Sequence, residues 1–221
     1  MPHARRIGVT MRVVRSDHGE TRDALARDWP VLFDRLGRLG GHAPDWLMLP
    51  NTGGDCVELA RRQGVRGLLL TGGDDLGATP DRDETETALL RWAEREGLPV
   101  LGVCRGAQLL ACQAGARLVP LAPERHVATR HDIVWRSVEA GPAGLPPAGR
   151  RGEVNSYHAW GLEAAHLPAC LAPLAVCPED GSVEAFVHTR LPWRGILWHP
   201  EREPQPAACD LPLLQALFTI N

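Results

Sequence analysis

The sequence predicts an α/β fold with a mainly parallel central sheet flanked by helices and an antiparallel elaboration in its second half. Apolar runs alternate with amphipathic helical stretches through the first half, which is typical of parallel strands joined by right-handed crossovers. Short apolar strands separated by Pro- and Gly-rich turns fill the second half. Of the 221 residues, 44% are hydrophobic. This is enough for one sizeable core, so we expect a single domain over residues 1–221.

The elements of the first half alternate regularly along the chain. Strand-like apolar runs fall at 6–14, 45–50, 67–73 and 99–104, and helical patterns fall at 21–40, 55–63, 86–97 and 106–116. Parallel sheets place their chemistry at the carboxyl ends of their strands. Two of these strands end in Thr-Gly-Gly and in Gly-Val-Cys. Candidate site residues therefore occur at the carboxyl ends of strands, where a parallel sheet places its active site.

The elements of the second half are shorter and contain fewer helices. Strands are expected at 132–138, 154–158, 174–177, 183–188 and 195–199, and an amphipathic helix at Leu211 to Ile220. Few intervening helices favour antiparallel pairing. The Gly- and Pro-rich segment 140–152 is interpreted as a surface loop within the domain.

Composition and charge exclude several classes of function. The formal net charge of −3 argues against nucleic-acid or membrane-surface partners, which need a basic excess. All 24 lysine-plus-arginine positions are arginine, which excludes Schiff-base catalysis and a lysine-bearing phosphate loop. The sequence leaves open whether the chain forms homo-oligomers.

The sequence also predicts a cytoplasmic protein. The first residues, MPHARRIGVT, lack the apolar core of a signal peptide, and no stretch approaches the roughly 20 apolar residues that span a bilayer. The six cysteines show neither C-x-x-C spacing nor a compact disulfide pattern. A reducing compartment fits that usage.

Cys104 lies in PVLGVCRGAQLLA, an apolar run that ends in Gly-x-Cys-x-Gly and continues as a helical pattern. The pattern presents one thiol at a sharp strand-to-helix turn. Gly102 and Gly106 lack the Cβ atoms that would crowd such a turn. The backbone N–H groups that begin the helix favour the thiolate. Cys104 is therefore the candidate nucleophile.

His199 and Glu201 lie on either side of Pro200 in GILWHPE. The proline favours an extended backbone at His199, and positions i and i+2 of an extended chain project to the same side. Glu201 is therefore expected to orient the His199 imidazole, which in turn serves the Cys104 thiol.

These motifs resemble a known family. GVCRGAQ, the upstream LLLTGGDDLG and the downstream WHPE are similar to class I glutamine amidotransferases, and in particular to the stand-alone γ-glutamyl hydrolases of the peptidase C26 type. The resemblance runs from about Arg6 to the C-terminus. It implies a flavodoxin-like sheet and acyl transfer from a small-molecule γ-glutamyl amide to the cysteine, with no cofactor.

The implied reaction needs two donors for an oxyanion and groups that bind glutamate. The backbone N–H of Arg105 and that of Gly72 or Gly73 are the candidate oxyanion donors, and the family resemblance agrees with both placements. Gln108 lies one helical turn after Cys104, where the glutamine of the family motif binds the γ-glutamyl group. The resemblance adds secondary substrate contacts: Asn155, Ser156, Tyr157 and His158.

Two further groups of polar residues receive structural interpretations. Asp83 and Glu86 are spaced as a capping box. His126 and His131 resemble metal ligands, but we find no cysteine or carboxylate cluster to complete a coordination shell. We therefore expect no metal, and interpret this stretch as a mobile loop in which His131 touches substrate.

Several substrates remain open at this stage. The stretches RDALARDWPVLF and SVEAFVHTRLPWRGILWHPERE resemble a branch associated with capsule phosphoramidate synthesis, in which γ-glutamyl-CDP-amidate is hydrolysed. Such a substrate needs diphosphate contacts, for which Arg105, Arg130 or Arg202 are candidates. The alternatives are a γ-glutamyl-aminobutyrate or polyamine hydrolase and a glutaminase subunit that supplies ammonia to a synthetase.

Overall fold

The core of the fold is a sheet whose first strands are parallel. The computed structural model describes residues 5–40, 44–138, 143–205, 207 and 209–218. The parallel strands are, in spatial order, β4 (Asp45–Leu49), β1 (Arg6–Thr10), β5 (Gly67–Leu70), β6 (Val100–Val103) and β13 (Trp193–Ile196). β5 and β6 are buried along their whole length. Central strands covered on both faces explain the continuous apolar runs in the sequence.

Antiparallel strands extend the sheet beyond β13. They are, in spatial order, β12 (Val183–His188), β11 (Leu171–Val176), β8 (Val127–Trp135) and β9 (Arg151–Tyr157). The complete order is β4-β1-β5-β6-β13-β12-β11-β8-β9. The expected fold class, a mainly parallel sheet with an antiparallel elaboration, is confirmed.

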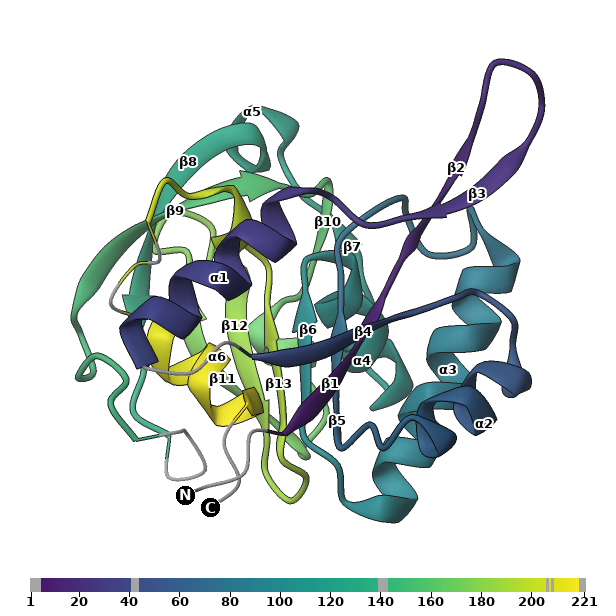
Figure 1. Ribbon diagram of the computed structural model, residues 1–221. Helices are drawn as coiled ribbons and strands as arrows, with labels where there is room; N and C mark the ends of the chain where they lie inside the picture. The colour runs from purple at the N-terminus through teal and green to yellow at the C-terminus, as the bar shows by residue number, and fades with distance from the viewer. Residues whose placement is uncertain (1–4, 41–43, 139–142, 206, 208, 219–221) are drawn as a thin grey trace.

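Helices cover both faces of the parallel part (Figure 1). α1 (Asp28–Gly40) and α6 (Asp210–Phe218) pack on one face, and α2 (Gly54–Arg62), α3 (Pro80–Glu96) and α4 (Arg105–Gln113) pack on the other. Two hydrophobic cores result, one on each side of the sheet. α3 begins at a proline, whose fixed φ suits the first helical turn, and ends at Gly97 in the left-handed conformation.

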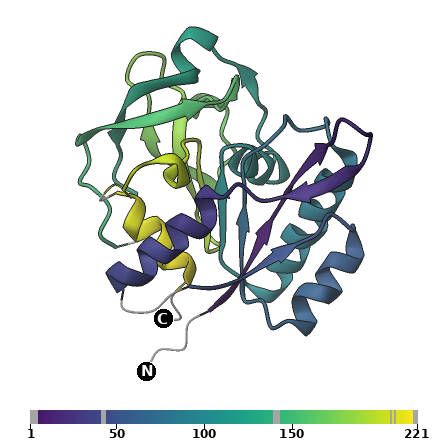
Figure 2. The same ribbon diagram turned by 45° about the horizontal axis from the view of Figure 1, so that its top comes forward.

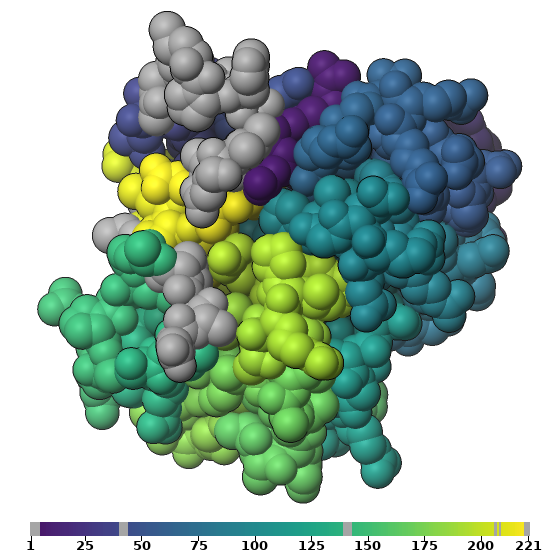
Figure 3. Space-filling model, turned by 90° about the horizontal axis from the view of Figure 1, so that it is seen from below, coloured from purple at the N-terminus to yellow at the C-terminus, as the bar shows by residue number. Residues whose placement is uncertain are grey.

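The two ends of the parallel strands differ in what covers them. Short elements surround the carboxyl end: α5 (Pro123–His126), η1 (Ala164–His166), η2 (Pro200–Arg202) and the small sheet of β7 (Val119–Pro120) with β10 (Trp160–Gly161). Figure 2 brings this end toward the viewer. Figure 3 shows the opposite end, where α6, in yellow, lies near α1.

Three sequence expectations need correction. Residues 6–14 form two strands, because β2 (Arg12–Arg15) leaves the main sheet and pairs with β3 (Thr21–Ala24) in a hairpin that projects from the body (Figure 1). The helix expected at 21–40 therefore begins only at Asp28. The strand expected at 195–199, in the antiparallel second half, is β13. It pairs with β6 in parallel on one side and with β12 antiparallel on the other.

Two expected segments lie partly outside the described residues. The surface loop 140–152 is described only from residue 143, and its described part joins β8 to β9. The final helix ends at Phe218, and the expected residues 219–220 are outside the described range.

Candidate active site

Cys104 occupies a sharp turn between β6 and α4. Its backbone has φ 52° and ψ −110°, a region that residues with a Cβ rarely adopt. The turn depends on close backbone packing, since a Cβ on Gly102 would lie 2.6 Å from the backbone nitrogen of Ala107, and one on Gly106 would collide with the Leu70 carbonyl. The two glycines of Gly-x-Cys-x-Gly are thus needed because neighbouring backbone atoms leave no room for a Cβ, as well as because of the turn geometry.

His199 and Glu201 follow β13, the strand next to β6. The imidazole Nδ1 lies 2.7 Å from Glu201 Oε1, and both side chains are buried. Asn155 of β9 fixes the His199 backbone, because its Oδ1 accepts from the His199 N–H at 2.8 Å and its Nδ2 donates to the His199 carbonyl at 2.8 Å. The predicted pairing of His199 with Glu201 is therefore present in the structure.

Cys104 and His199 face each other across Gly72. A Cβ added to Gly72 would lie 2.6 Å from His199 Cε1 and 3.6 Å from Cys104 Cβ. The carboxyl ends of three neighbouring strands, β5, β6 and β13, therefore bring together the three sequence motifs. A side chain at position 72 would therefore collide with the imidazole.

The cysteine and the histidine stabilise each other's charged form. Burial raises the pKa of the Cys104 thiol, but the hydrogen bond to His199, the nearby charges of His199 and His158 and the Arg105 backbone N–H together hold that pKa below its usual value. Burial also opposes the charge on His199, yet its hydrogen bonds to Cys104 and Glu201 raise its pKa to about 9. Both shifts favour a thiolate–imidazolium pair.

Arg82 holds the Thr-Gly-Gly turn from the side of α3. Its guanidinium donates to the Thr71 carbonyl at 2.7 Å and to the Gly72 carbonyl at 3.1 Å. The C=O and N–H of a trans peptide point in opposite directions, so the Gly73 N–H faces away from Arg82. The sequence motifs did not identify Arg82 as part of the site, because the two carbonyls that it binds belong to a different element.

A buried ionic network supports both turns. Arg82 Nε donates to Glu86 Oε1 at 3.0 Å, and the Arg105 side chain pairs with both Glu86 and Asp83. Thr10 Oγ1 also donates to Glu86, at 2.6 Å. The network joins α3 to α4 beneath the nucleophile turn, and its two arginines balance its two carboxylates.

Two expectations about this network are wrong. Asp83 and Glu86 do not form a capping box, because the N-cap of α3 is Thr79, and Asp83 accepts from the backbone N–H of Gly77 at 2.8 Å. The Arg105 guanidinium is not a diphosphate contact, since the side chain is buried and paired with two carboxylates. Only its backbone N–H faces the thiol.

The expected substrate-binding residues are distributed differently. Gln108 is buried and donates from Nε2 to the Trp160 carbonyl at 2.8 Å. Tyr157 is 43% exposed, with its ring 5.6 Å from the His199 ring and the Arg202 guanidinium 4.2 Å above it. Gln108 and Tyr157 therefore lie beside the Cys104–His199 pair.

Of the remaining four, Asn155 holds the His199 backbone, and the other three point into the protein. Ser156 is fully buried and donates from Oγ to the His126 carbonyl at 2.7 Å. His131 lies on β8 rather than in a mobile loop, and His131 and His158 are buried beside Glu184 of β12. The expectation that no carboxylate joins the histidines is therefore wrong, because Glu184 supplies one.

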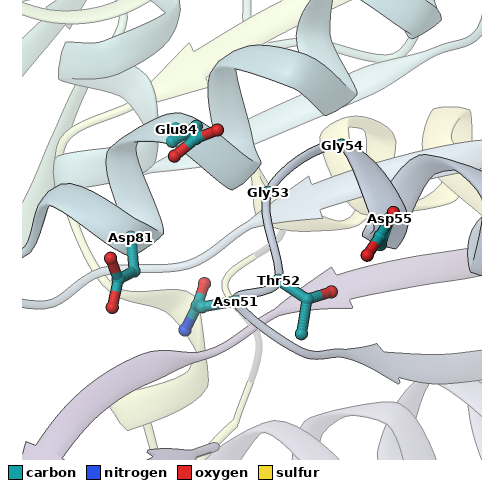
Figure 4. A pocket seen from close by; sticks show the side chains of 7 residues that line it. All are labelled: Asn51, Thr52, Gly53, Gly54, Asp55, Asp81 and Glu84. Atoms are coloured by element: carbon teal, nitrogen blue, oxygen red, sulfur yellow. The ribbon is translucent and has the colours of Figure 1, made fainter.

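A polar hollow lies apart from this site. Figure 4 shows its lining at the starts of α2 and α3: Asn51, Thr52, Gly53, Gly54, Asp55, Asp81 and Glu84. It contains no residue that the sequence analysis assigned to catalysis or substrate binding. Its three carboxylates would repel a diphosphate, so it is not the expected nucleotide subsite.

The fold and the arrangement of the site define a class. The fold is similar to the glutaminase domain of Trypanosoma brucei CTPS with bound acivicin, with a TM-score of 0.72, 16% identity and coverage of 96% of this chain and 93% of that one. It is also similar to a glutamine amidotransferase from Thermotoga maritima, with a TM-score of 0.62, 15% identity and coverage of 90% and 77%. The fold is that of glutamine amidotransferases.

Residues 46–201 match the Peptidase C26 family, and the chain belongs to that family. It is 28% identical to the γ-glutamyl-CDP-amidate hydrolase of Campylobacter jejuni over 89% of this chain and 90% of the relative. It is 30% identical to the carbamoyl phosphate synthase small chain of Symbiobacterium thermophilum over 82% of this chain and 46% of the relative. It is also 30% identical to anthranilate synthase component 2 of Azospirillum brasilense, over 66% and 69%.

Within the described part of the chain, no helix combines the length and the apolar character needed to cross a bilayer.

Proposed function

We propose that this protein is a cysteine hydrolase that cleaves a γ-glutamyl amide through a γ-glutamyl thioester. The observation that carries the proposal is the placement of Cys104 and His199 on either side of Gly72, with Glu201 bonded to the imidazole at 2.7 Å. Membership of the Peptidase C26 family supports the reaction class.

In the proposed mechanism, the Cys104 thiolate attacks the γ-carboxamide carbon. His199 then donates its proton to the leaving nitrogen as the C–N bond breaks, which leaves a thioester. A water molecule gives a proton to His199 and attacks the thioester, and the thiolate leaves with free glutamate as product. Glu201 orients the imidazole and offsets its positive charge.

We assign the oxyanion donors to two backbone N–H groups. The Arg105 N–H already faces the thiol, and Gly73 presents its N–H on the side opposite to Arg82. Such donors are worth about 3 kcal/mol each in the transition state. We assign Gln108 to the glutamyl group through its Oε1, because its Nε2 is engaged by the Trp160 carbonyl.

We propose γ-glutamyl-CDP-amidate as the substrate, with cytidine diphosphoramidate as the second product. The name of the C. jejuni relative, aligned over 89% of the chain, supports this substrate. Arg130 is a weak diphosphate candidate, because Glu153 and Glu203 hold it at 2.6 and 2.7 Å. Among the described residues Arg202 has no carboxylate within ion-pair distance, and it lies over Tyr157 beside His199. Arg202 is therefore our candidate.

A glutaminase subunit is the second candidate function. The synthase relatives are each 30% identical to the chain, and they support it. In that case the leaving group would be ammonia, which would pass to a partner synthetase.

The test compares leaving groups. Purified protein is incubated with γ-glutamyl-CDP-amidate, glutamine, γ-glutamyl-aminobutyrate and a γ-glutamyl polyamine, and kcat/KM is ranked by glutamate release. We expect the CDP conjugate to rank first and Cys104→Ala to abolish turnover of every substrate. Preference for glutamine or for an aminobutyrate or polyamine conjugate would overturn the proposed substrate, and full activity of folded Cys104→Ala would overturn the mechanism.

The diphosphate contact has its own test. Arg202→Gln should raise KM for the CDP conjugate about tenfold, the usual loss for one charge-assisted hydrogen bond, and leave slow glutamine turnover unchanged. Arg61→Gln on α2 is the matched control and should change neither value. Equal effects of Arg202→Gln on both substrates would contradict a diphosphate contact.

A further inference from the structure

Three histidines and one glutamate meet in the protein interior next to the candidate active site. His126 ends α5, His131 lies on β8, His158 follows β9 and Glu184 lies on β12. Their exposed fractions are 0%, 6%, 3% and 0%. Three stretches of the chain thus come together, the first of which contributes two histidines, and we call the four residues the His₃Glu cluster.

The ligand-type atoms of the His₃Glu cluster surround one point. His131 Nε2 and His158 Nε2 lie 3.6 and 3.5 Å from Glu184 Oε2, and His126 Nδ1 lies 3.7 Å from Glu184 Oε1. One nitrogen or oxygen of each residue lies within 4.8 Å of the others. In a tetrahedral zinc site with bonds of about 2.0–2.1 Å, neighbouring ligand atoms are about 3.3–3.4 Å apart. The three distances to Glu184, 3.5–3.7 Å, are close to this value, and ligand atoms as far as 4.8 Å apart would have to move closer around an ion.

Each imidazole is held through the nitrogen that points away from that centre. His126 Nε2 lies 2.7 Å from Asp180 Oδ2, His131 Nδ1 lies 3.1 Å from the Asp132 carbonyl, and His158 Nδ1 lies 3.1 Å from the Trp160 carbonyl. Because all three partners are acceptors, each outer nitrogen carries the proton. In the neutral form of each ring, the inner nitrogen then presents a lone pair, as in metal-bound histidines.

The four inner atoms have no hydrogen-bond partner among the described residues. They are His126 Nδ1, His131 Nε2, His158 Nε2 and Glu184 Oε2. Glu184 Oε1 is engaged, because the Ser182 hydroxyl donates to it at 3.0 Å. Buried acceptors that face one another without a partner are costly, and a positive charge between them, from a metal ion or from a proton on His158, removes that cost.

We propose that the His₃Glu cluster binds one Zn²⁺ ion in a closed, four-coordinate structural site. Imidazole nitrogens with one carboxylate oxygen are a ligand set typical of zinc. All four ligands come from the protein and are buried, so the ion has no position for substrate. It ties α5, β8, β12 and the turn after β9 together.

The site has a direct connection to the candidate active site. The Trp160 carbonyl accepts from His158 Nδ1 at 3.1 Å and from Gln108 Nε2 at 2.8 Å. The metal therefore fixes the turn against which the glutamyl-binding Gln108 is oriented. The zinc acts through position and takes no part in the bond changes.

The test is the metal content of the full-length protein, which does not depend on its substrate. Protein from zinc-supplemented growth is dialysed and analysed by elemental mass spectrometry. We expect one zinc per chain, retained in the controls Cys104→Ala and His166→Ala and lost in His131→Gln and Glu184→Gln. His166 is an exposed histidine paired with Glu163. Cys104→Ala excludes zinc held by the active-site thiol.

A second measurement on the unaltered protein covers the case in which the variants fail to fold. X-ray absorption at the zinc edge should show nitrogen and oxygen ligands only, and removal of the metal by a chelator should lower the melting temperature by several degrees. Protein that takes up no zinc, a sulfur ligand in the spectrum, or full zinc content in folded Glu184→Gln would overturn the proposal.

Discussion

The two sides of the β6–β13 pair supply different kinds of group to the candidate site. The turns after β5 and β6 contribute mainly backbone, namely the Gly73 and Arg105 N–H groups and the strained turn that carries Cys104. The side beyond β6 contributes side chains that other side chains hold: Glu201 and Asn155 fix His199. The turns after β5 and β6 hold their groups in place by backbone geometry, whereas the groups beyond β6 are held by side-chain hydrogen bonds.

This difference teaches which changes each part tolerates. The positions of backbone donors on central strands are fixed by close packing. An added methyl group there should therefore lower activity more than the loss of one hydrogen bond. Side chains held by polar contacts tolerate small changes of volume but respond to the loss of one partner through their charge state. The predictions below separate these two behaviours.

The largest effect is expected for Gly72→Ala. The new Cβ would lie 2.6 Å from His199 Cε1, so it must push the imidazole from the thiol, and a displacement of about 1 Å costs about a hundredfold in rate. The measurement is kcat, with folding checked by circular dichroism. Gly54→Ala, where a Cβ has open space, is the control. Activity close to that of the unaltered protein would show that the two side chains do not cooperate.

Arg82→Lys should have the next largest effect. Lysine keeps the positive charge beside Glu86 but cannot bind both the Thr71 and Gly72 carbonyls. We expect kcat to fall about thirtyfold, because one oxyanion donor is misaligned, while KM and the rate of Cys104 alkylation stay unchanged. If alkylation slowed in parallel, the arginine would act on the thiol instead of the turn.

The pH profile tests the side of the site that carries His199. The pKa of His199 is raised to about 9 and that of Cys104 is lowered, and both shifts favour the ion pair at neutral pH. We expect a flat kcat/KM there, with a fall of about tenfold per pH unit above about 9, where His199 loses the proton that the leaving nitrogen needs. Asn155→Ala, which frees the His199 backbone, should move this limb to lower pH.

Alkylation of Cys104 by iodoacetamide checks the same pair without substrate. The rate should already be high at neutral pH and should decline only where acid protonates the thiolate. A midpoint at the value of an ordinary thiol would contradict the lowered pKa.

The smallest effect concerns stability at the nucleophile. Cys104 has φ 52°, which costs a residue with a Cβ about 1–3 kcal/mol and glycine much less. The free energy of unfolding of Cys104→Gly should therefore exceed that of Cys104→Ala by about 1 kcal/mol, after the greater unfolded-state entropy of glycine is subtracted. Cys104→Gly should then unfold at a higher urea concentration. Equal stabilities in urea titrations would show that the turn relaxes in the absence of the sulfur.

Local patterns predicted the parallel part of the fold well. Strand and helix alternate there over short distances, and the glycines around Cys104 encode their turn directly. The hairpin of β2 and β3 escaped prediction because residues 21–24 continue the helical pattern of α1 and pair only with a neighbouring strand. Strand β13 was recognised as a strand, but its parallel partner β6 is about ninety residues earlier and invisible to local reasoning.

The site was predictable where one motif contains the whole geometry. The Cys104 turn and the His199–Glu201 pair are of this kind. Arg82 and the His₃Glu cluster are not, because their partners come from separate elements. Glu184 lies in VEAFVH, which reads as an apolar core strand, and its carboxylate meets the histidines only after β12 pairs inside the sheet.

The oxygen shared by Gln108 and His158 belongs to the main chain, since it is the carbonyl of Trp160. Any amino acid at position 160 supplies this oxygen, and the indole itself is 38% exposed. The number of residues between β9 and β10 cannot change in the same way. A deletion of one residue there would remove the anchor of both side chains at once, whereas replacement of the tryptophan would leave it intact. At this corner the number of residues between β9 and β10 is therefore constrained, whereas the amino acid at position 160 is free to change.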